Sequence, residues 1–206
     1  MTRTLVRRTV LLGVAAMAAV SLAACGDSSD SSSSPMSGMN QTSAAATASA
    51  DAAFNDADVS FAQGMIPHHQ QAVEMAKLAA TRASGADVKK LAQQIEAAQG
   101  PEITTMTGWL TAWGKPTAAP SMGNMNTADG GMPGMMSDAD MTKLKAASGA
   151  AFDKQFLTMM IAHHQGAITM SKDELAKGSN SDAKTLAQKI ITAQQAEIDT
   201  MNGLLG

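Results

Sequence analysis

FAQGMIPHHQQAVEMAK at residues 61–77 recurs as FLTMMIAHHQGAITMSK at residues 156–172, an offset of 95 positions (163 − 68). The same offset aligns VKKLAQQIEAAQGPEITTMTGWL at 88–110 with AKTLAQKIITAQQAEIDTMNGLL at 183–205 without a gap. About half of the aligned positions are identical, which chance does not supply over such a span. The chain is therefore an internal duplication, and its fold must bring two copies of one unit together.

Each half is expected to form two helices, because apolar residues recur at helical spacing and no segment alternates as a strand does. The first helix should end near 84–85 or 178–179, where a glycine suits a C-terminal cap, and the second should follow a polar Asp or Ser cap. Pro67 and Gly100–Pro101 should kink helices rather than end them, and Ser137 should cap a short extra helix. Neither hairpin can bury its apolar face alone. These features predict an all-α, pseudo-symmetric antiparallel four-helix bundle.

The first 24 residues have the features of a lipoprotein signal peptide. Three arginines precede an apolar run over residues 10–24, which is short for a membrane-spanning helix. The run ends in Leu-Ala-Ala-Cys at 22–25, the pattern at which lipoprotein signal peptidase cleaves. We therefore expect an exported chain, lipidated at Cys25 and anchored to the outer face of the cytoplasmic membrane.

The remaining chain divides by composition. Residues 25–52 are rich in Ser, Ala and Asp with few large apolar side chains, which predicts a disordered tether. Residues 53–206 should form the duplicated bundle, with hairpins at 53–113 and 138–206. A connector at 114–137, rich in Gly, Pro and Met, separates the hairpins.

The amino-acid composition limits the kinds of metal site and partner that this chain can have. The chain has 17 Met, 4 Phe and no Tyr among 206 residues. Cys25 is the only cysteine, so a soft-metal site must be built from Met and His rather than from thiolates. The formal net charge is −3, and it becomes −6 (12 − 18) without residues 1–24. This acidic balance argues against a nucleic-acid partner.

All four histidines lie in the duplicated motif, on one helix face with methionines. At about 100° per residue, Met65 and Met75 lie within roughly 60° of His68 around the helix axis, and the second half repeats the pattern. Thioethers beside imidazoles are typical of copper sites, since hard ions avoid thioethers and zinc normally takes Cys, His or carboxylate. The candidate copper ligands, for Cu(I) or Cu(II), are Met65, His68, His69, Met75, Met160, His163, His164 and Met170.

Other residues are candidates for supporting roles. Glu102 and Glu197 interrupt the apolar stripe of the second helices and could orient a histidine or bind metal directly. Met106 and Met201 suit either core filling or ligation. The connector offers a further set of thioethers for Cu(I), namely Met122, Met125, Met132, Met135 and Met136.

The motif Met-Ile-Pro-His-His-Gln-Gln-Ala-Val-Glu-Met-Ala at 65–76, with its partner at 160–165, resembles the bacterial domain of unknown function 305 family. That family includes CopM-type periplasmic copper-binding proteins. The resemblance covers roughly residues 54–206 and implies a ferritin-like helical bundle and copper binding or resistance through Met and His. The Glu-x-x-His motif of ferritin-type di-iron proteins is missing from the sequence, which argues against a di-iron oxidase.

The leading hypothesis is a copper-binding lipoprotein for sequestration, delivery or resistance, and not an enzyme. A copper-dependent redox enzyme and a metal-free structural protein of the cell envelope stay open as alternatives. The expected partners are the metal ion and the membrane, while a protein partner and homo-oligomerisation are left undecided by the sequence.

Overall fold

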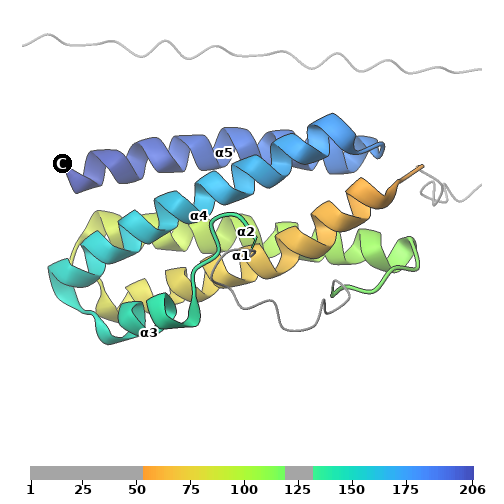
Figure 1. Cartoon of the computed structure of the whole chain (residues 1–206). Helices are drawn as coiled ribbons and strands as arrows, with labels where there is room; N and C mark the ends of the chain where they lie inside the picture. The colour runs from red at the N-terminus through yellow and green to blue at the C-terminus, as the bar shows by residue number, and fades with distance from the viewer. Residues whose placement is uncertain (1–52, 119–131) are drawn as a thin grey trace, which may run out of the picture. The chain divides into compact units, whose positions relative to one another are not determined.

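The computed structural model describes residues 53–118 and 132–206, which fold into five helices. The helices are α1 (Asp56–Arg82), α2 (Ala86–Ala112), α3 (Asp138–Ala146), α4 (Gly149–Lys177) and α5 (Ser181–Leu205). The expected signal peptide, the tether, Cys25, Met122 and Met125 lie outside these ranges. Within the described ranges there is no strand, and none of the five helices has an apolar stretch that could span a bilayer. The α1–α2 and α4–α5 hairpins form the predicted all-α antiparallel bundle (Figure 1).

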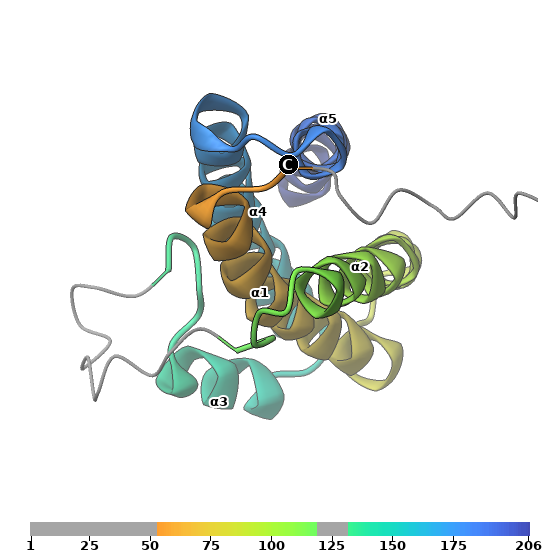
Figure 2. The same ribbon diagram turned by 90° about the vertical axis from the view of Figure 1, so that its right-hand side faces the viewer.

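Helices α1 and α4 are the central pair and run antiparallel. The start of α1 meets the end of α4, where Asp58 binds the backbone N–H groups of Ser179 and Asn180. The end of α1 meets the start of α4, where Ala83 and Gly149 form an isolated bridge. Seen end-on, α2 and α5 lie beside this pair, and α3 lies on the side of α1 away from α2 (Figure 2). A pseudo-twofold axis therefore passes between the middles of α1 and α4.

Each hairpin turn is capped by an aspartate of the other hairpin. Asp153 accepts hydrogen bonds from the N–H groups of Ser84 (3.1 Å) and Gly85 (2.8 Å). Its equivalent Asp58 does the same for Ser179 (3.1 Å) and Asn180 (2.9 Å). The expected Asp or Ser caps were wrong in both hairpins: Gly85 is the N-cap of α2 and Asn180 that of α5. Asp153 of α4 thus holds the backbone of the turn that leads into α2.

The glycines in these turns serve close packing rather than left-handed backbone. Gly178 is the C-cap of α4, as expected, whereas α1 ends at Ala83 and Gly85 is the N-cap of α2; the φ angles of Gly85 and Gly178 are −72° and −67°. A Cβ atom on Gly178 would overlap the Glu174 carboxyl group and lie 2.8 Å from Asp58 Oδ1. Both α1 and α2 continue through their prolines, as expected, and the Ser137 side chain caps α3 by accepting from the Asp140 N–H.

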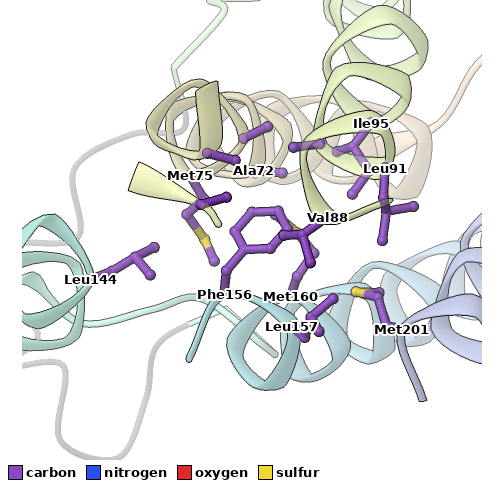
Figure 3. Packing of buried hydrophobic residues seen from close by; sticks show 14 of the residues in the cluster. Ala72, Met75, Val88, Leu91, Ile95, Leu144, Phe156, Leu157, Met160 and Met201 are labelled. Atoms are coloured by element: carbon purple, nitrogen blue, oxygen red, sulfur yellow. The ribbon is translucent and has the colours of Figure 1, made fainter. Parts of the chain in front are cut away.

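Two hydrophobic clusters fill the bundle. One, the α3 cluster, joins Leu144 of α3 to Phe156 of α4 and Ile95 of α2 (Figure 3). The other, the Phe61 cluster, joins Phe61 to Leu110 of α2 and Ile190 of α5. Along α1, the buried apolar residues between 59 and 66 belong to the Phe61 cluster and those between 72 and 79 to the α3 cluster. The histidines at 68–69 therefore lie in a layer between two apolar cores.

Glu174 breaks the symmetry of the duplication, since its equivalent in the first half is Ala79. Glu174 is buried, and no donor reaches either of its carboxyl oxygens. Burial raises its pKa to about 8, and the hydrogen bond and negative charge of Asp58 act in the same direction. Burial alone would raise the pKa of Asp58, but hydrogen bonds from Glu174 and from backbone N–H groups outweigh it, so that pKa is lowered. Glu174 is therefore mostly protonated at neutral pH, beside the ionised Asp58 carboxylate.

This carboxyl pair should make stability pH-dependent. The folded pKa of Glu174 is raised, so its stabilisation is complete below the ordinary carboxyl pKa of 4.5 and is lost as pH rises toward about 8. The free energy of unfolding of the wild type should therefore fall over that pH window. In Glu174→Gln this fall should be smaller by about 2 kcal/mol, as measured by urea unfolding at several pH values. Asp173→Asn, at an exposed neighbour, is the control, and equal pH slopes in all three proteins would contradict the assignment.

Candidate metal centre

His68 and His163 meet where α1 crosses α4. Their ring centroids are 3.8 Å apart, with an interplanar angle of 40°, and both side chains are fully buried. The two residues are equivalent in the duplication, so each lies next to the pseudo-twofold axis and contacts its own copy. The duplicated motif thus forms one shared centre rather than two remote ones.

Both central imidazoles are neutral. Burial lowers the pKa of His68 to about 4, partly offset by its hydrogen bond to the Pro133 carbonyl. Burial lowers the pKa of His163 to about 2, and the neighbouring histidines add to that effect. A metal ion binds the unprotonated imidazole, so no proton must leave these rings before they can act as ligands.

The outer histidines each contact a carboxylate of the neighbouring helix. Nε2 of His69 lies 2.8 Å from Oε2 of Glu102, and Nε2 of His164 lies 2.6 Å from Oε2 of Glu197. A carboxylate acceptor places the ring proton on Nε2, which leaves Nδ1 with a free lone pair. The sequence predicted that each glutamate could orient a histidine. In the structure each carboxylate contacts an imidazole in the way that carboxylates orient metal-binding imidazoles in other proteins.

The ring nitrogens of this layer are largely without partners. His68 Nε2 donates to the carbonyl oxygen of Pro133 at 3.0 Å. Nδ1 of every histidine, and also Nε2 of His163, is buried with no hydrogen-bond partner. Buried polar atoms are normally paired, so these unpartnered ring nitrogens indicate that the layer binds something. Imidazole lone pairs suit a transition-metal ion.

The methionines are not grouped around the histidines as the helical projection predicted. Met65 and Met75 share a helix face, yet Met65 lies in the Phe61 cluster and Met75 in the α3 cluster. Each cluster instead collects one thioether from each of three helices. The Phe61 cluster has Met65, Met106 and the half-buried Met170, and the α3 cluster has the equivalent Met160, Met201 and Met75. An equivalent set of three thioethers, related by the pseudo-twofold axis, thus lies on each side of the histidine layer, and the α3 cluster also contains Met141 and the half-buried Met136 and Met159.

Within residues 53–118 and 132–206, no three side chains of His, Cys, Asp or Glu meet in a geometry that would hold a metal ion. The paired histidines supply at most two such ligands at one point, so a metal held here needs Met, backbone or water to complete its coordination. Thioethers bind soft ions, and Cu(I) accepts low coordination numbers. The donor set therefore fits copper better than zinc, calcium or magnesium.

The described end of the connector packs on the bundle. Met132, Met135 and Met136 are half-buried, rather than fully exposed as an unattached connector would be. Gln71 holds this segment, accepting from the Met136 N–H at 2.7 Å and donating to its carbonyl at 2.9 Å. The sequence did not single out Gln71, although the change to Gly166 at the equivalent position was visible in the alignment of the two halves.

A second pair of polar residues was also missed. Gln99 and Gln194, equivalent in the duplication, are buried on α2 and α5 one turn before Glu102 and Glu197. Both amide atoms of Gln99 and the Oε1 atom of Gln194 have no partner. A buried glutamine repeated at the same offset within an apolar stripe is the signal that could have found them.

The sequence profile of the domain of unknown function DUF305 matches residues 58–205. The chain belongs to the DUF305 family. A crystal structure of a DUF305 protein from Streptomyces coelicolor, described as secreted, is 36% identical with a TM-score of 0.66, covering 72% of this chain and 91% of the other. A DUF305 fragment from Deinococcus radiodurans is 34% identical with a TM-score of 0.66, covering 74% and 97%.

CopM in its Cu(II)-bound form is also similar to this DUF305 chain. It is 34% identical with a TM-score of 0.63, covering 72% of this chain and 95% of CopM. Structures of CopM with Cu(I) and with Ag match as well. An uncharacterized protein of Acanthamoeba polyphaga mimivirus is 49% identical over 53 residues, and the match spans only 35% of that viral protein.

The low pKa values can be read directly by NMR. Because burial lowers the pKa of His68 to about 4 and that of His163 further, both imidazoles should stay neutral in metal-free protein at pH 6. Their depressed pKa values also mean that stability falls as pH drops below the ordinary value of 6.5, because the unfolded chain takes up protons first. Imidazole ¹⁵N shifts during an acid titration test this. Protonation of both rings near pH 6.5 would contradict the buried-pair geometry.

Proposed function

We propose that this protein is an exported, lipid-anchored copper-binding protein that sequesters or delivers copper through its Met and His side chains and so contributes to copper resistance. The observation that carries the proposal is the layer of four buried histidines with unpartnered ring nitrogens. The central two are neutral, the outer two are oriented by carboxylates, and an equivalent set of three thioethers lies in each adjoining cluster.

The chemistry of the donors supports copper as cargo. Imidazole nitrogen accepts either Cu(I) or Cu(II), whereas thioether sulfur favours Cu(I). The only cysteine of the chain is the predicted lipid-attachment residue, so the thiolate sites that hold zinc are not available. The relatives support the same cargo, since CopM has been crystallised with Cu(II), Cu(I) and Ag and shares this fold.

The proposed location rests on the N-terminal sequence. A basic start, an apolar run and Leu-Ala-Ala-Cys at 22–25 are the features of a lipoprotein leader. A relative of similar fold is described as secreted. An extracytoplasmic site suits a copper-binding protein, because it meets the metal before it reaches the cytoplasm.

Copper binding is tested by removing the central pair. His68→Asn with His163→Asn should lower the affinity for copper at least about tenfold, because both imidazoles are ligands that are neutral before metal arrives. Equilibrium dialysis of purified protein with metal analysis measures it, and copper should raise the melting temperature of the wild type. Gln70→Ala with Gln165→Ala is the matched control, since these residues adjoin the same motif but are exposed. Equal copper binding by wild type and the histidine variant would refute the proposal.

Membrane anchoring is tested separately. Cys25→Ser should remove the lipid-attachment site and shift the protein from the membrane to the soluble fraction, without changing copper binding by the purified chain. Cell fractionation and labelling with a fatty-acid analogue measure the change, with Ser34→Ala in the expected tether as control. A Cys25→Ser protein that stays in the membrane fraction and still takes up label would show that Cys25 is not the anchor.

A further inference from the structure

The two thioether groups beside the histidine layer are covered differently. In the α3 cluster, Met75 is fully buried and lies opposite Leu144 of α3 (Figure 3). Met141 of α3 belongs to the same cluster. In the Phe61 cluster, the equivalent Met170 is only half-buried. It lines a surface pocket of about 390 Å³ together with Phe61 and Glu174. One thioether group is therefore sealed by α3, and the other reaches the surface at Met170.

A second thioether, that of Met132, lies near Met170 on the other side of Gly64. A Cβ atom on Gly64 would be 2.9 Å from Met170 Cε and 3.5 Å from Met132 Sδ. Met132 and Met170 thus converge on space that a side chain at position 64 would fill. The equivalent residue in the second half is Met159, which carries its own thioether. In the first half, the connector supplies the thioether that α1 lacks.

The connector is held firmly at this position. Gly134, at φ 77°, lies so close to α4 that a Cβ atom would be 2.6 Å from the Ala162 carbonyl oxygen. A Cβ atom on Gly166 would overlap the Pro133 carbonyl group. Two hydrogen bonds from Gln71 hold Met136, and Pro133 accepts from His68. Since residues 133–136 are fixed in this way, the position of Met132 is set by the fold.

The site is also accessible to solvent and close to the histidines. Gly64 and Met132 line a second surface pocket of about 510 Å³. On α1, Gly64 lies one helical turn before His68, whose Nδ1 has no partner. An ion held between the two thioethers would therefore lie at the surface and one turn from the buried imidazoles.

We infer that Met132 and Met170 form a surface thioether site for a soft monovalent ion, Cu(I) or Ag(I), through which the ion reaches the histidine layer. The inference rests on the proposed copper-binding function and adds the oxidation state and the point of uptake. Two neutral sulfur ligands offer little to Cu(II) or Zn²⁺, so the site selects the monovalent form. Gly64 and Gly166 then have one explanation: each leaves room for the connector and its thioether.

The test uses the full chain and Ag(I), which binds as Cu(I) does without changing oxidation state. Met132→Leu and Met170→Leu should each lower the affinity of this surface site for Ag(I) about tenfold, while Ag(I) binding at the histidine layer stays unchanged. The fold loss of Ag(I) affinity in the double variant should be smaller than the product of the fold losses in the two single variants, because the two sulfurs bind one ion. Leucine conserves volume, so the fold should tolerate each change, and melting curves verify this.

Two further variants sharpen the test. Met141→Leu, in the core of the α3 cluster, is the matched control and should leave Ag(I) affinity unchanged. Gln71→Leu keeps every thioether but removes both hydrogen bonds to Met136, and it should weaken Ag(I) binding in the same direction. Unchanged Ag(I) affinity in the Met132 and Met170 variants would overturn this inference and leave copper binding at the histidines standing. A wild-type chain that binds neither Ag(I) nor Cu(II) would overturn both.

Discussion

The contact between His68 and His163 is the constraint on which the rest of the bundle depends. In a duplicated fold, the residue nearest the pseudo-twofold axis must pack against its own copy, and here that residue is an imidazole at a centroid distance of 3.8 Å. Two protonated rings could not share this buried space, and burial keeps both neutral. The antiparallel crossing of α1 and α4 follows from the same contact, as does the need for apolar clusters on either side to exclude water.

Three differences between the two halves affect the structure described above, and two of them have a common physical cause. A single connector joins the halves, so it can lie against only one side of a symmetric core. Gln71 binds it where the second half has Gly166, and Gly64 admits Met132 where the second half has Met159. The third departure, Glu174 for Ala79, has another origin, since it places a protonated carboxyl group against the Asp58 cap. Duplication thus supplied the bundle, and divergence made one end chemically distinct from the other.

Much of this architecture follows from the sequence, because a repeat at constant offset fixes helix number, pairing and the shared histidine face. The glutamates were found because a carboxylate within an apolar stripe needs a partner. The thioethers were misplaced because a helical projection sorts residues around the axis but not along it. Met65 and Met75 share a face, but ten residues separate them by roughly 15 Å, and so they fall in different clusters. The caps by Asp58 and Asp153 were missed since they join hairpins far apart in sequence.

Burial also bears on which oxidation state the proposed copper site favours. A cation that enters the histidine layer brings charge into an apolar interior, and the cost of that transfer rises steeply with charge. The nearest compensation is Glu102 and Glu197, each one hydrogen bond behind an imidazole and partly exposed at the edge of the layer. A monovalent ion needs less of this compensation than a divalent one. Burial therefore acts in the same direction as thioether softness, so that an ion taken up as Cu(I) gains nothing from oxidation once it reaches the interior.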